Sequence, residues 1–262
     1  MSLLGRIGAP LLGWLRRSLA ILGISWAVVR EGLRPRTWSA PVRAVLARQI
    51  LFTGIEAMRF VGGLGVIIGI AVVLQTWAML MRFGRSDLLG PVLVTLIVRE
   101  LGPLLTNFIV IGRSGNAIAT ELATMKIRGE VRLLEGSGVD PFLYLVIPRA
   151  VGMALSMLGL GVLFVVVTFA SATLVGTFLR GQGAQAMLFT RNLFAAVTPT
   201  DLINLVAKLL LPGMLIAVIC AREGLSVRGA ATEVPQAATR GVMRSVAALF
   251  VVILVASIMT YR

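Results

Sequence analysis

Four charged residues lie inside or beside long apolar runs, where their side chains can contact the polar part of a ligand. Arg99 and Glu100 are adjacent in one run, and Asp201 and Lys208 are seven residues apart in another. Charges at membrane depth are costly and usually face a cavity or a partner. The chain has no His, which excludes histidine catalysis and histidine metal sites. These residue types therefore predict electrostatic binding, with no catalytic and no metal site.

Pro103 makes the first pair more specific. It follows Arg99 by four residues and has no N–H for the Arg99 carbonyl, so a polar group is left free there. Neighbouring helical residues point about 100° apart, so Arg99 and Glu100 do not simply pair with each other. The alternative is a helix N-terminus, with Glu100 favouring the dipole and Arg99 snorkelling to the interface.

The second pair also has two interpretations. Thr198-Pro-Thr-Asp201 has the pattern of a helix N-cap with proline in the first turn, so Asp201 serves either as a cap or as a cavity residue. Lys208 lies on the same helical face, about 10 Å further along. It either lines a cavity or snorkels.

The composition predicts that these residues lie in a membrane protein. The 262-residue chain is 58% hydrophobic and 14% charged, with a mean hydropathy of +0.95. A soluble domain is about 45–50% apolar and about 25% charged. The net charge of +14 on such a chain indicates membrane orientation and anionic headgroups rather than nucleic acid. No P-loop motif occurs, so any nucleotide hydrolysis requires another protein.

A bilayer-spanning helix needs about 20 apolar residues. The sequence predicts an all-α integral membrane protein with five transmembrane helices. Residues 88–98 are expected to form a re-entrant or interfacial piece before the second span. Gly65 and Gly69 allow close helix packing in the first span. The spans are predicted at about 60–81, 99–119, 150–179, 202–221 and 241–260.

The first 58 residues are expected to form interfacial amphipathic helices ahead of a transmembrane domain over 59–262. Tryptophan and arginine alternate with apolar residues there, which suits headgroup depth. The alternative is a sixth span over residues 11–29, at the cost of burying Arg16 and Arg17.

The distribution of Lys and Arg predicts the orientation. With five spans, seventeen basic residues fall on one side and five on the other. The positive-inside rule then places the N-terminus in the cytoplasm and the C-terminus outside.

An amphipathic helix is predicted over about residues 119–135, on the cytoplasmic side between spans two and three. Apolar residues recur at helical spacing on one face, and Lys126 and Glu130 form an i,i+4 pair. It is either an ordinary interfacial helix or a docking helix for a cytoplasmic partner. The polar residues expected to face a partner are Glu121, Thr124, Arg128, Glu130, Arg132 and Glu135.

Several segments resemble the MlaE/YrbE permeases, the membrane subunits of Mla/Mce lipid ABC transporters. The central resemblance runs through Arg99-Glu-Leu-Gly-Pro-Leu-Leu-Thr106 and Gly112-Arg-Ser-Gly-Asn-Ala-Ile-Ala119. It continues in Val139-Asp-Pro141, in Asp201-Leu-Ile-Asn with Lys208, and in Ala237-Ala-Thr-Arg-Gly-Val-Met-Arg-Ser245. The chain departs from the family at Gly129-Glu130, Arg132 and Gln236.

The resemblance implies a permease of the bacterial inner membrane that moves phospholipid and supports outer-membrane lipid asymmetry. It implies a homodimer with a lipid cavity near Arg99, Glu100, Leu101, Asp201 and Lys208. The implied partners are a cytoplasmic ABC ATPase at the helix over 119–135, a periplasmic Mce-domain (MlaD-like) protein and a small STAS-domain cytoplasmic subunit. ATP and magnesium are expected in the ATPase, and no cofactor is expected in this chain.

Two other functional classes remain as alternatives. A secondary transporter would show inverted repeats and broken helices in both halves, and no repeat is found. A membrane anchor or scaffold for an Mce-domain protein would hold no lipid of its own. A lipid-modifying enzyme is disfavoured because the chain has few acidic residues and no His.

Overall fold

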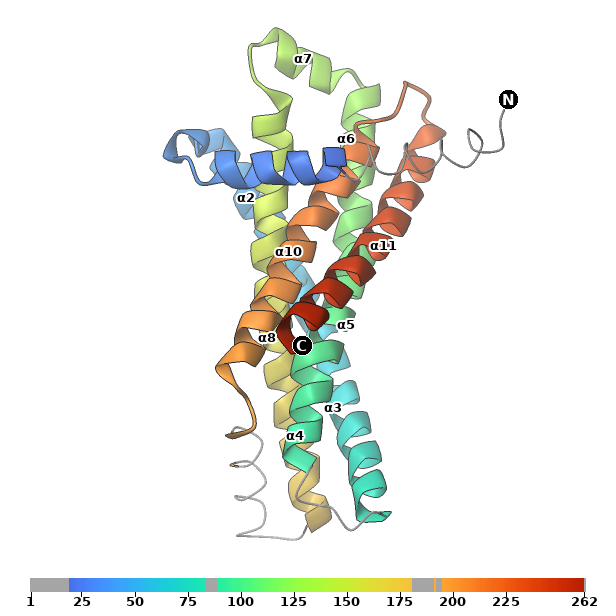
Figure 1. The fold of residues 1–262 in the computed structure, drawn as a ribbon. Helices are drawn as coiled ribbons and strands as arrows, with labels where there is room; N and C mark the ends of the chain where they lie inside the picture. The colour runs from blue at the N-terminus through green and yellow to red at the C-terminus, as the bar shows by residue number, and fades with distance from the viewer. Residues whose placement is uncertain (1–18, 83–88, 181–190, 192–194, 262) are drawn as a thin grey trace, which may run out of the picture. The chain divides into compact units, whose positions relative to one another are not determined.

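The structure, a computed structural model, describes residues 19–82, 89–180, 191 and 195–261 (Figure 1). Within these ranges the regular structure is helical, with no strand. The predicted all-α fold with five candidate membrane spans is confirmed by the length and composition of the helices. These spans are Ala40–Arg82, Gly90–Ile127, Phe142–Phe178, Pro199–Gly224 and Glu233–Thr260.

Short π-helical stretches interrupt three of the five spans. π-Helical turns leave backbone groups without their usual α-helical partners, and they occur often at functional sites. They cover Leu51–Ile55, Thr95–Leu101, Ile111–Gly115 and Phe142–Val146. After a helix over residues 19–32, the α-helices are α2 (Ala40–Ile50), α3 (Glu56–Arg82), α4 (Leu89–Val94), α5 (Gly102–Val110), α6 (Asn116–Ile127), α7 (Glu130–Gly136), α8 (Ile147–Arg180), α10 (Pro199–Gly224) and α11 (Glu233–Tyr261).

The predicted interfacial piece over residues 88–98 is wrong. Residues from Leu89 are helical without interruption to Ile127, so Arg99 and Glu100 lie inside a span rather than at a helix N-terminus. The prediction assumed that two charges end a span. The structure instead satisfies both charges with side chains from α10, as described below.

The N-terminal region also differs from the expected pair of interfacial helices. The second predicted piece, from Pro41 to Met58, is continuous with the first span through the π-helical turn at Leu51–Ile55. The alternative span over residues 11–29 falls partly outside the described residues, which begin at 19. Arg16 and Arg17 therefore lie outside the described part.

The chain divides into two compact units, each built from three stretches of sequence. The first comprises Met1–Gln49, Gly115–Gly152 and Met214–Ser245, and the second comprises Ile50–Ser114, Met153–Gly213 and Val246–Arg262. The division falls within α8, α10 and α11, so each of these helices contributes residues to both units.

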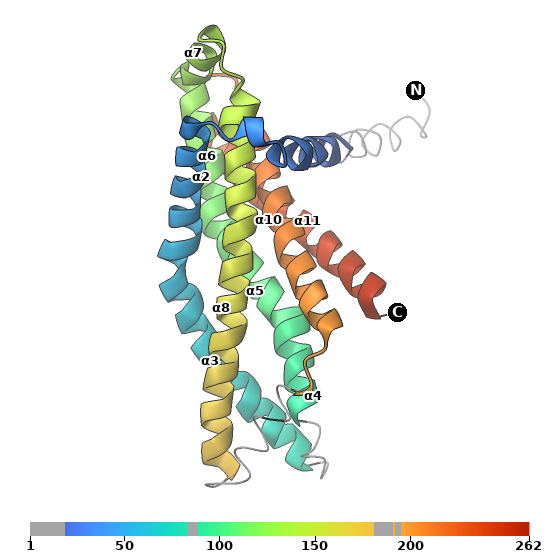
Figure 2. The ribbon, with the colours of Figure 1, turned by 90° about the vertical axis from the view of Figure 1, so that its left-hand side faces the viewer.

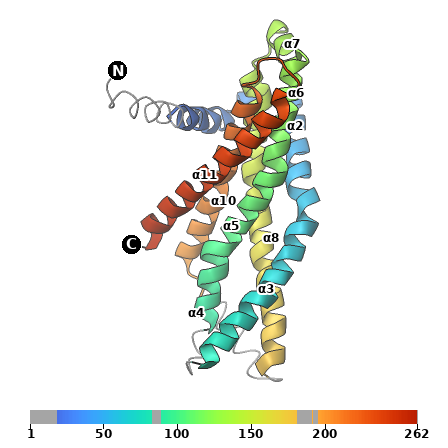
Figure 3. The same cartoon turned by 90° about the vertical axis from the view of Figure 1, so that its right-hand side faces the viewer.

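In the first unit, the end of α10 and the start of α11 pack closely on α6 (Figure 3). A Cβ added to Gly224 would lie 2.5 Å from the Ala119 carbonyl oxygen, and one on Gly241 would lie 3.5 Å from Cys220. A small apolar cluster of Ala123, Val227 and Ala237 continues this contact. These small residues allow the backbones to approach.

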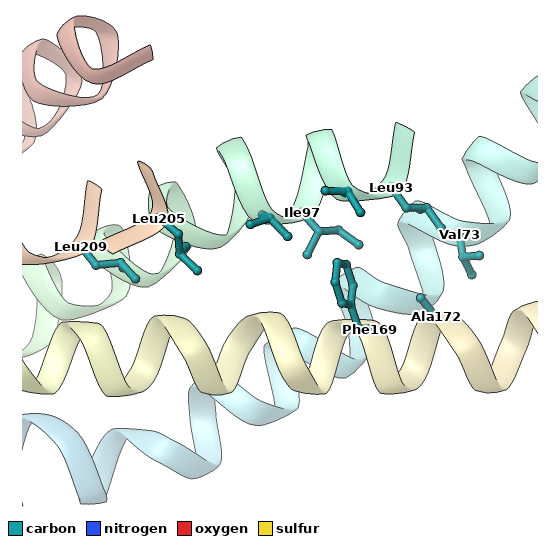
Figure 4. Close-up of a cluster of buried hydrophobic side chains, with 9 residues drawn as sticks. Val73, Leu93, Ile97, Phe169, Ala172, Leu205 and Leu209 are labelled. Atoms are coloured by element: carbon teal, nitrogen blue, oxygen red, sulfur yellow. The ribbon is translucent and has the colours of Figure 1, made fainter. Parts of the chain in front are cut away.

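The second unit has an apolar core drawn from four spans. Val73 of α3, Phe169 and Ala172 of α8, and Leu205 and Leu209 of α10 meet residues of the second span in one buried cluster. In Figure 4, Phe169 points from α8 toward Ile97. The helices that carry the charged residues are therefore held by apolar packing around them.

Close contact between α3 and α8 confirms the expectation for Gly65 and Gly69. A Cβ on Gly65 would lie 3.3 Å from the Phe164 carbonyl oxygen, and one on Gly69 would lie 2.5 Å from that of Thr168. Figure 2 shows α3 crossing α8 in the second unit. At Gly69 a Cβ would overlap the α8 backbone, which cannot rotate away as a side chain can, whereas at Gly65 the neighbour would have to move by only a few tenths of an ångström.

Gly69→Ala is expected to destabilise the chain, by about 1–3 kcal/mol, because the methyl group overpacks against the α8 backbone. Gly63→Ala is the matched control, since its Cβ would meet nothing within 4 Å on the same helix. Both changes bring the same gain in helix propensity. Unfolding of the purified chain in SDS measures the difference, and equal stabilities would contradict the contact.

Candidate functional site

Two ion pairs join the second span to α10 inside the second unit. Arg99 Nε lies 2.8 Å from Asp201 Oδ1, and Lys208 Nζ lies 2.9 Å from Glu100 Oε1. All four predicted charged residues are thus brought together. The two adjacent residues belong to the π-helical stretch Thr95–Leu101, and they contact two positions seven residues apart on α10. The pairs have opposite polarity, with one cation on each helix.

The same two helices are also joined by hydrogen bonds in which a side chain of each helix donates to a backbone carbonyl of the other. Lys208 Nζ donates to the Arg99 carbonyl at 2.6 Å, and Pro103 has no N–H for that carbonyl. Pro212 inside α10 likewise has no N–H for the Lys208 carbonyl, which accepts from Asn107 Nδ2 at 3.0 Å. A proline on each helix therefore frees a carbonyl that a side chain from the other helix satisfies.

Asp201 combines both roles that its sequence allows. Its carboxylate accepts from the backbone N–H of Thr198 at 3.0 Å and from the Thr198 hydroxyl at 2.8 Å. Its own N–H lies 3.3 Å from that hydroxyl, which completes a reciprocal cap at the start of α10. The predicted cap is confirmed, and the same carboxylate holds Arg99.

Burial divides the four charged residues into a buried half and an accessible half. The side chains of Asp201 and Lys208 are fully buried, whereas those of Arg99 and Glu100 are 27% and 46% exposed. Leu101, the fifth cavity candidate, is half-buried. The α10 residues are therefore positioned to hold the partly exposed charges of the second span in place.

Two polar residues at this site escaped the sequence analysis. Buried Asn107 also donates to the Pro103 carbonyl at 2.7 Å, and Ser257 of α11 lies 3.2 Å from Glu100 Oε1. The sequence could have indicated Asn107, because it is an amide inside an apolar run four residues after a proline. It could not have indicated Ser257, since a lone serine in a span commonly bonds its own helix.

Arg113 forms a second polar anchor within this unit. Its guanidinium donates to the Phe52 carbonyl at 2.8 Å and to Glu56 Oε2 at 2.6 Å. It also lies 4.7 Å from the centroid of the Phe52 ring. Phe52 belongs to the π-helical turn Leu51–Ile55, so a side chain again reaches a carbonyl in an irregular stretch of helix.

The predicted single helix over residues 119–135 is wrong. α6 ends at Ile127, and α7 begins at Glu130 after Gly129, whose φ of 79° is left-handed. This break ends the expected i,i+4 relation of Lys126 and Glu130. Lys126 instead donates to the Leu225 carbonyl, and Arg128 lies 3.9 Å from Glu130. Only glycine adopts such a φ without steric cost.

The six residues expected to contact a partner have different surroundings. Glu121 is exposed and accepts from buried Arg149 at 2.8 Å, and Thr124 bonds the Thr120 carbonyl of its own helix. Glu130 is half-buried. Arg128, Arg132 and Glu135 are exposed on the α6–α7 segment, while Val131 is buried as the apolar stripe predicts.

Among the described residues, no cluster of three or more His, Cys, Asp or Glu side chains is suited to hold a metal ion. The site therefore offers paired charges, a buried amide and an apolar surround.

Asn107→Leu is expected to lower the free energy of unfolding by about 1–3 kcal/mol, because two carbonyls lose a buried donor at nearly constant side-chain size. SDS titration of the purified chain measures the change. Ser257→Ala is the control and is expected to cost less than about 1 kcal/mol, since Glu100, the hydrogen-bond partner of Ser257, is half-exposed. If Asn107→Leu lowers the free energy of unfolding less than Ser257→Ala does, the hydrogen bonds of Asn107 to the two carbonyls do not stabilise the fold as proposed.

Comparison of the sequence with known proteins shows the family of this chain. The family described as "Permease MlaE" matches residues 46–259. Probable ABC transporter permease proteins of Rickettsia typhi and Rickettsia felis are 31% identical over 202 residues and 29% identical over 221 residues. These alignments cover 77% of this chain and of the R. typhi protein, and 84% of this chain and 83% of the R. felis protein.

The match also extends to a protein with a more specific name. The intermembrane phospholipid transport system permease protein MlaE of Haemophilus influenzae is 30% identical over 137 residues, 52% of each chain. The family match covers most of this chain and overlaps all five candidate spans. The chain is therefore a multi-pass membrane protein that belongs to the MlaE permease family.

Proposed function

We propose that this chain is the permease of an ATP-driven transporter that moves phospholipid between a bacterial inner membrane and a periplasmic Mce-domain carrier. Membership of the MlaE permease family and the ABC transporter names of its relatives support a permease. The name of the Haemophilus relative supports phospholipid as the substrate class.

The observation that carries this proposal is the pair of partly exposed charges held by buried partners. A phospholipid headgroup presents a phosphate and, in many lipids, an ammonium group. Arg99 supplies a guanidinium suited to phosphate, and Glu100 supplies a carboxylate suited to ammonium. Buried Asp201 and Lys208 fix these groups in advance, which lowers the cost of ordering them around a ligand.

A second copy of the chain and the lipid tails would cover the apolar side of α11. Large apolar residues remain exposed along that helix, and an apolar patch of this kind marks an interaction surface or lipid contact. We place the lipid cavity at the interface of a homodimer, with this side of α11 beside it. The exposed residues are Phe250, Val251, Leu254, Val255, Ile258 and Met259.

The α6–α7 segment is the proposed contact with the ATPase. Arg128, Arg132 and Glu135 are exposed there, and the break at Gly129 sets α7 at an angle to α6 (Figure 2). The ATPase, assisted by a small STAS-domain subunit, would bind ATP and magnesium. This segment would lie in the cytoplasm with the N-terminus, as the excess of basic residues predicts, and the C-terminus would lie in the periplasm.

Glu100→Gln is expected to lower phospholipid retained by the purified dimer about threefold to tenfold while leaving the dimer assembled. The change removes a charge beside the ligand but keeps an acceptor for Lys208. Native mass spectrometry counts lipid and subunits together. Glu31→Gln, which also removes a partly exposed acid that forms an ion pair, is the control. Unchanged lipid in E100Q would favour a purely structural role.

Charge reversal on the α6–α7 segment tests the ATPase contact. The double variant Arg128→Glu/Arg132→Glu is expected to reduce ATP-driven transfer of labelled phospholipid about tenfold or more in proteoliposomes. The reason is that like charges repel across an interface made for the opposite sign. Arg36→Glu/Arg43→Glu makes the same change at exposed residues elsewhere. Transport without ATP would indicate a secondary transporter, and lipid-free complexes would indicate a scaffold.

A further inference from the structure

The end of α10 and the start of α11 border a pocket of about 470 Å³ in the first unit. Four arginines and two glutamates contribute to its lining, so four positive charges against two negative charges leave a net charge of +2. These residues lie on the last turn of α10, the connecting loop and the first turns of α11. They are Arg222, Glu223, Arg228, Glu233, Arg240 and Arg244.

Both carboxylates of the pocket are already engaged by the protein. Glu223 is 5% exposed, pairs with Arg244 and lies 3.5 Å from Arg240 Nε. Glu233 accepts from the backbone N–H of Arg228 at 2.6 Å. The carboxylates therefore hold the loop and two of the arginines in place.

The guanidinium groups of Arg222 and Arg228 have no ion pair and no hydrogen bond to any other described residue. Each guanidinium presents five N–H donors in a planar fork. A half-buried Arg222 and an exposed Arg228 on the same pocket therefore offer donors that the described part of the chain does not use.

The backbone around the pocket is fixed before any ligand arrives. Gly224 packs against the Ala119 carbonyl, and the Cys220 and Ser245 side chains lie 3.4 Å apart between α10 and α11. Lys126 from α6 also donates to the Leu225 carbonyl of the connecting loop. A preformed wall reduces the ordering cost of binding.

We propose that this pocket binds the phosphate group of an anionic ligand, either a phospholipid headgroup or a soluble phosphate compound. Arginine forks match phosphate oxygens in geometry and charge. The pocket lies where one candidate span ends, at Gly224, and the next begins, at Glu233. The ends of a bilayer-spanning helix lie near the lipid headgroups. This site is separate from the charges at the first turn of α10 and does not depend on the transport function.

Binding of phosphatidylglycerol to the purified full-length chain tests the proposal. The lipid is titrated into the detergent-solubilised chain, and bound copies are counted by native mass spectrometry. Arg222→Gln/Arg228→Gln is expected to weaken binding about tenfold or more, since charge-assisted hydrogen bonds to phosphate are lost. Arg36→Gln/Arg43→Gln removes the same charge at exposed arginines outside the pocket and is expected to leave this binding unchanged.

Two further experiments are needed. One identifies the source of the phosphate, and the other tests the pocket with a variant that keeps every arginine, as a control for misfolding. Millimolar inorganic phosphate that displaces the lipid would indicate a soluble ligand, and failure to displace it would indicate a headgroup. Ser226→Glu places a carboxylate at the exposed edge of the pocket without removing an arginine, and it is also expected to weaken binding. Full binding in both pocket variants, or displacement only by an acidic peptide, would overturn the proposal.

Discussion

The second unit depends on one constraint, the need to satisfy backbone carbonyls inside apolar helices. An unpaired polar group in hydrocarbon costs several kcal/mol, and a proline creates one four residues before itself. Pro103 and Pro212 do so on facing helices. Lys208 and Asn107 then join the helices by donating across the contact. The carbonyl left unpaired by each proline would weaken an isolated helix, but here it accepts a hydrogen bond from the other helix and joins the two.

This constraint changes how the charged residues are interpreted. Lys208 serves the Arg99 carbonyl and the Glu100 carboxylate together, and Asp201 serves both its own helix cap and Arg99. A buried ion pair alone is weak evidence for stability. Here the pairs come with hydrogen bonds that complete the backbone, and their outer members remain partly exposed. The buried residues thus hold the partly exposed charges of the second span in place.

The sequence predicted the class of fold, the span count and the free Arg99 carbonyl, because length, hydropathy and proline chemistry are local. It did not predict that residues 89–98 belong to the second span, since charges satisfied by a distant helix resemble charges at an interface. It also missed the break at Gly129, because the apolar stripe keeps helical spacing on both sides of it. The sequence analysis used Arg222 and Arg228 only in the count of basic residues that predicts membrane orientation. Their local sequence does not show that they line one pocket.

The π-helical stretches account for the remaining difference between pattern and structure. Two of them contain a carbonyl that a side chain from another segment reaches, Phe52 for Arg113 and Arg99 for Lys208. A regular 3.6-residue period does not reveal such turns, because one extra residue in a turn shifts every side chain that follows it. Arg99 and Glu100 lie in one such stretch and pair with Asp201 and Lys208 of α10. The roles of Arg113 and Lys208 in these spans therefore include donating hydrogen bonds to carbonyls of irregular helix.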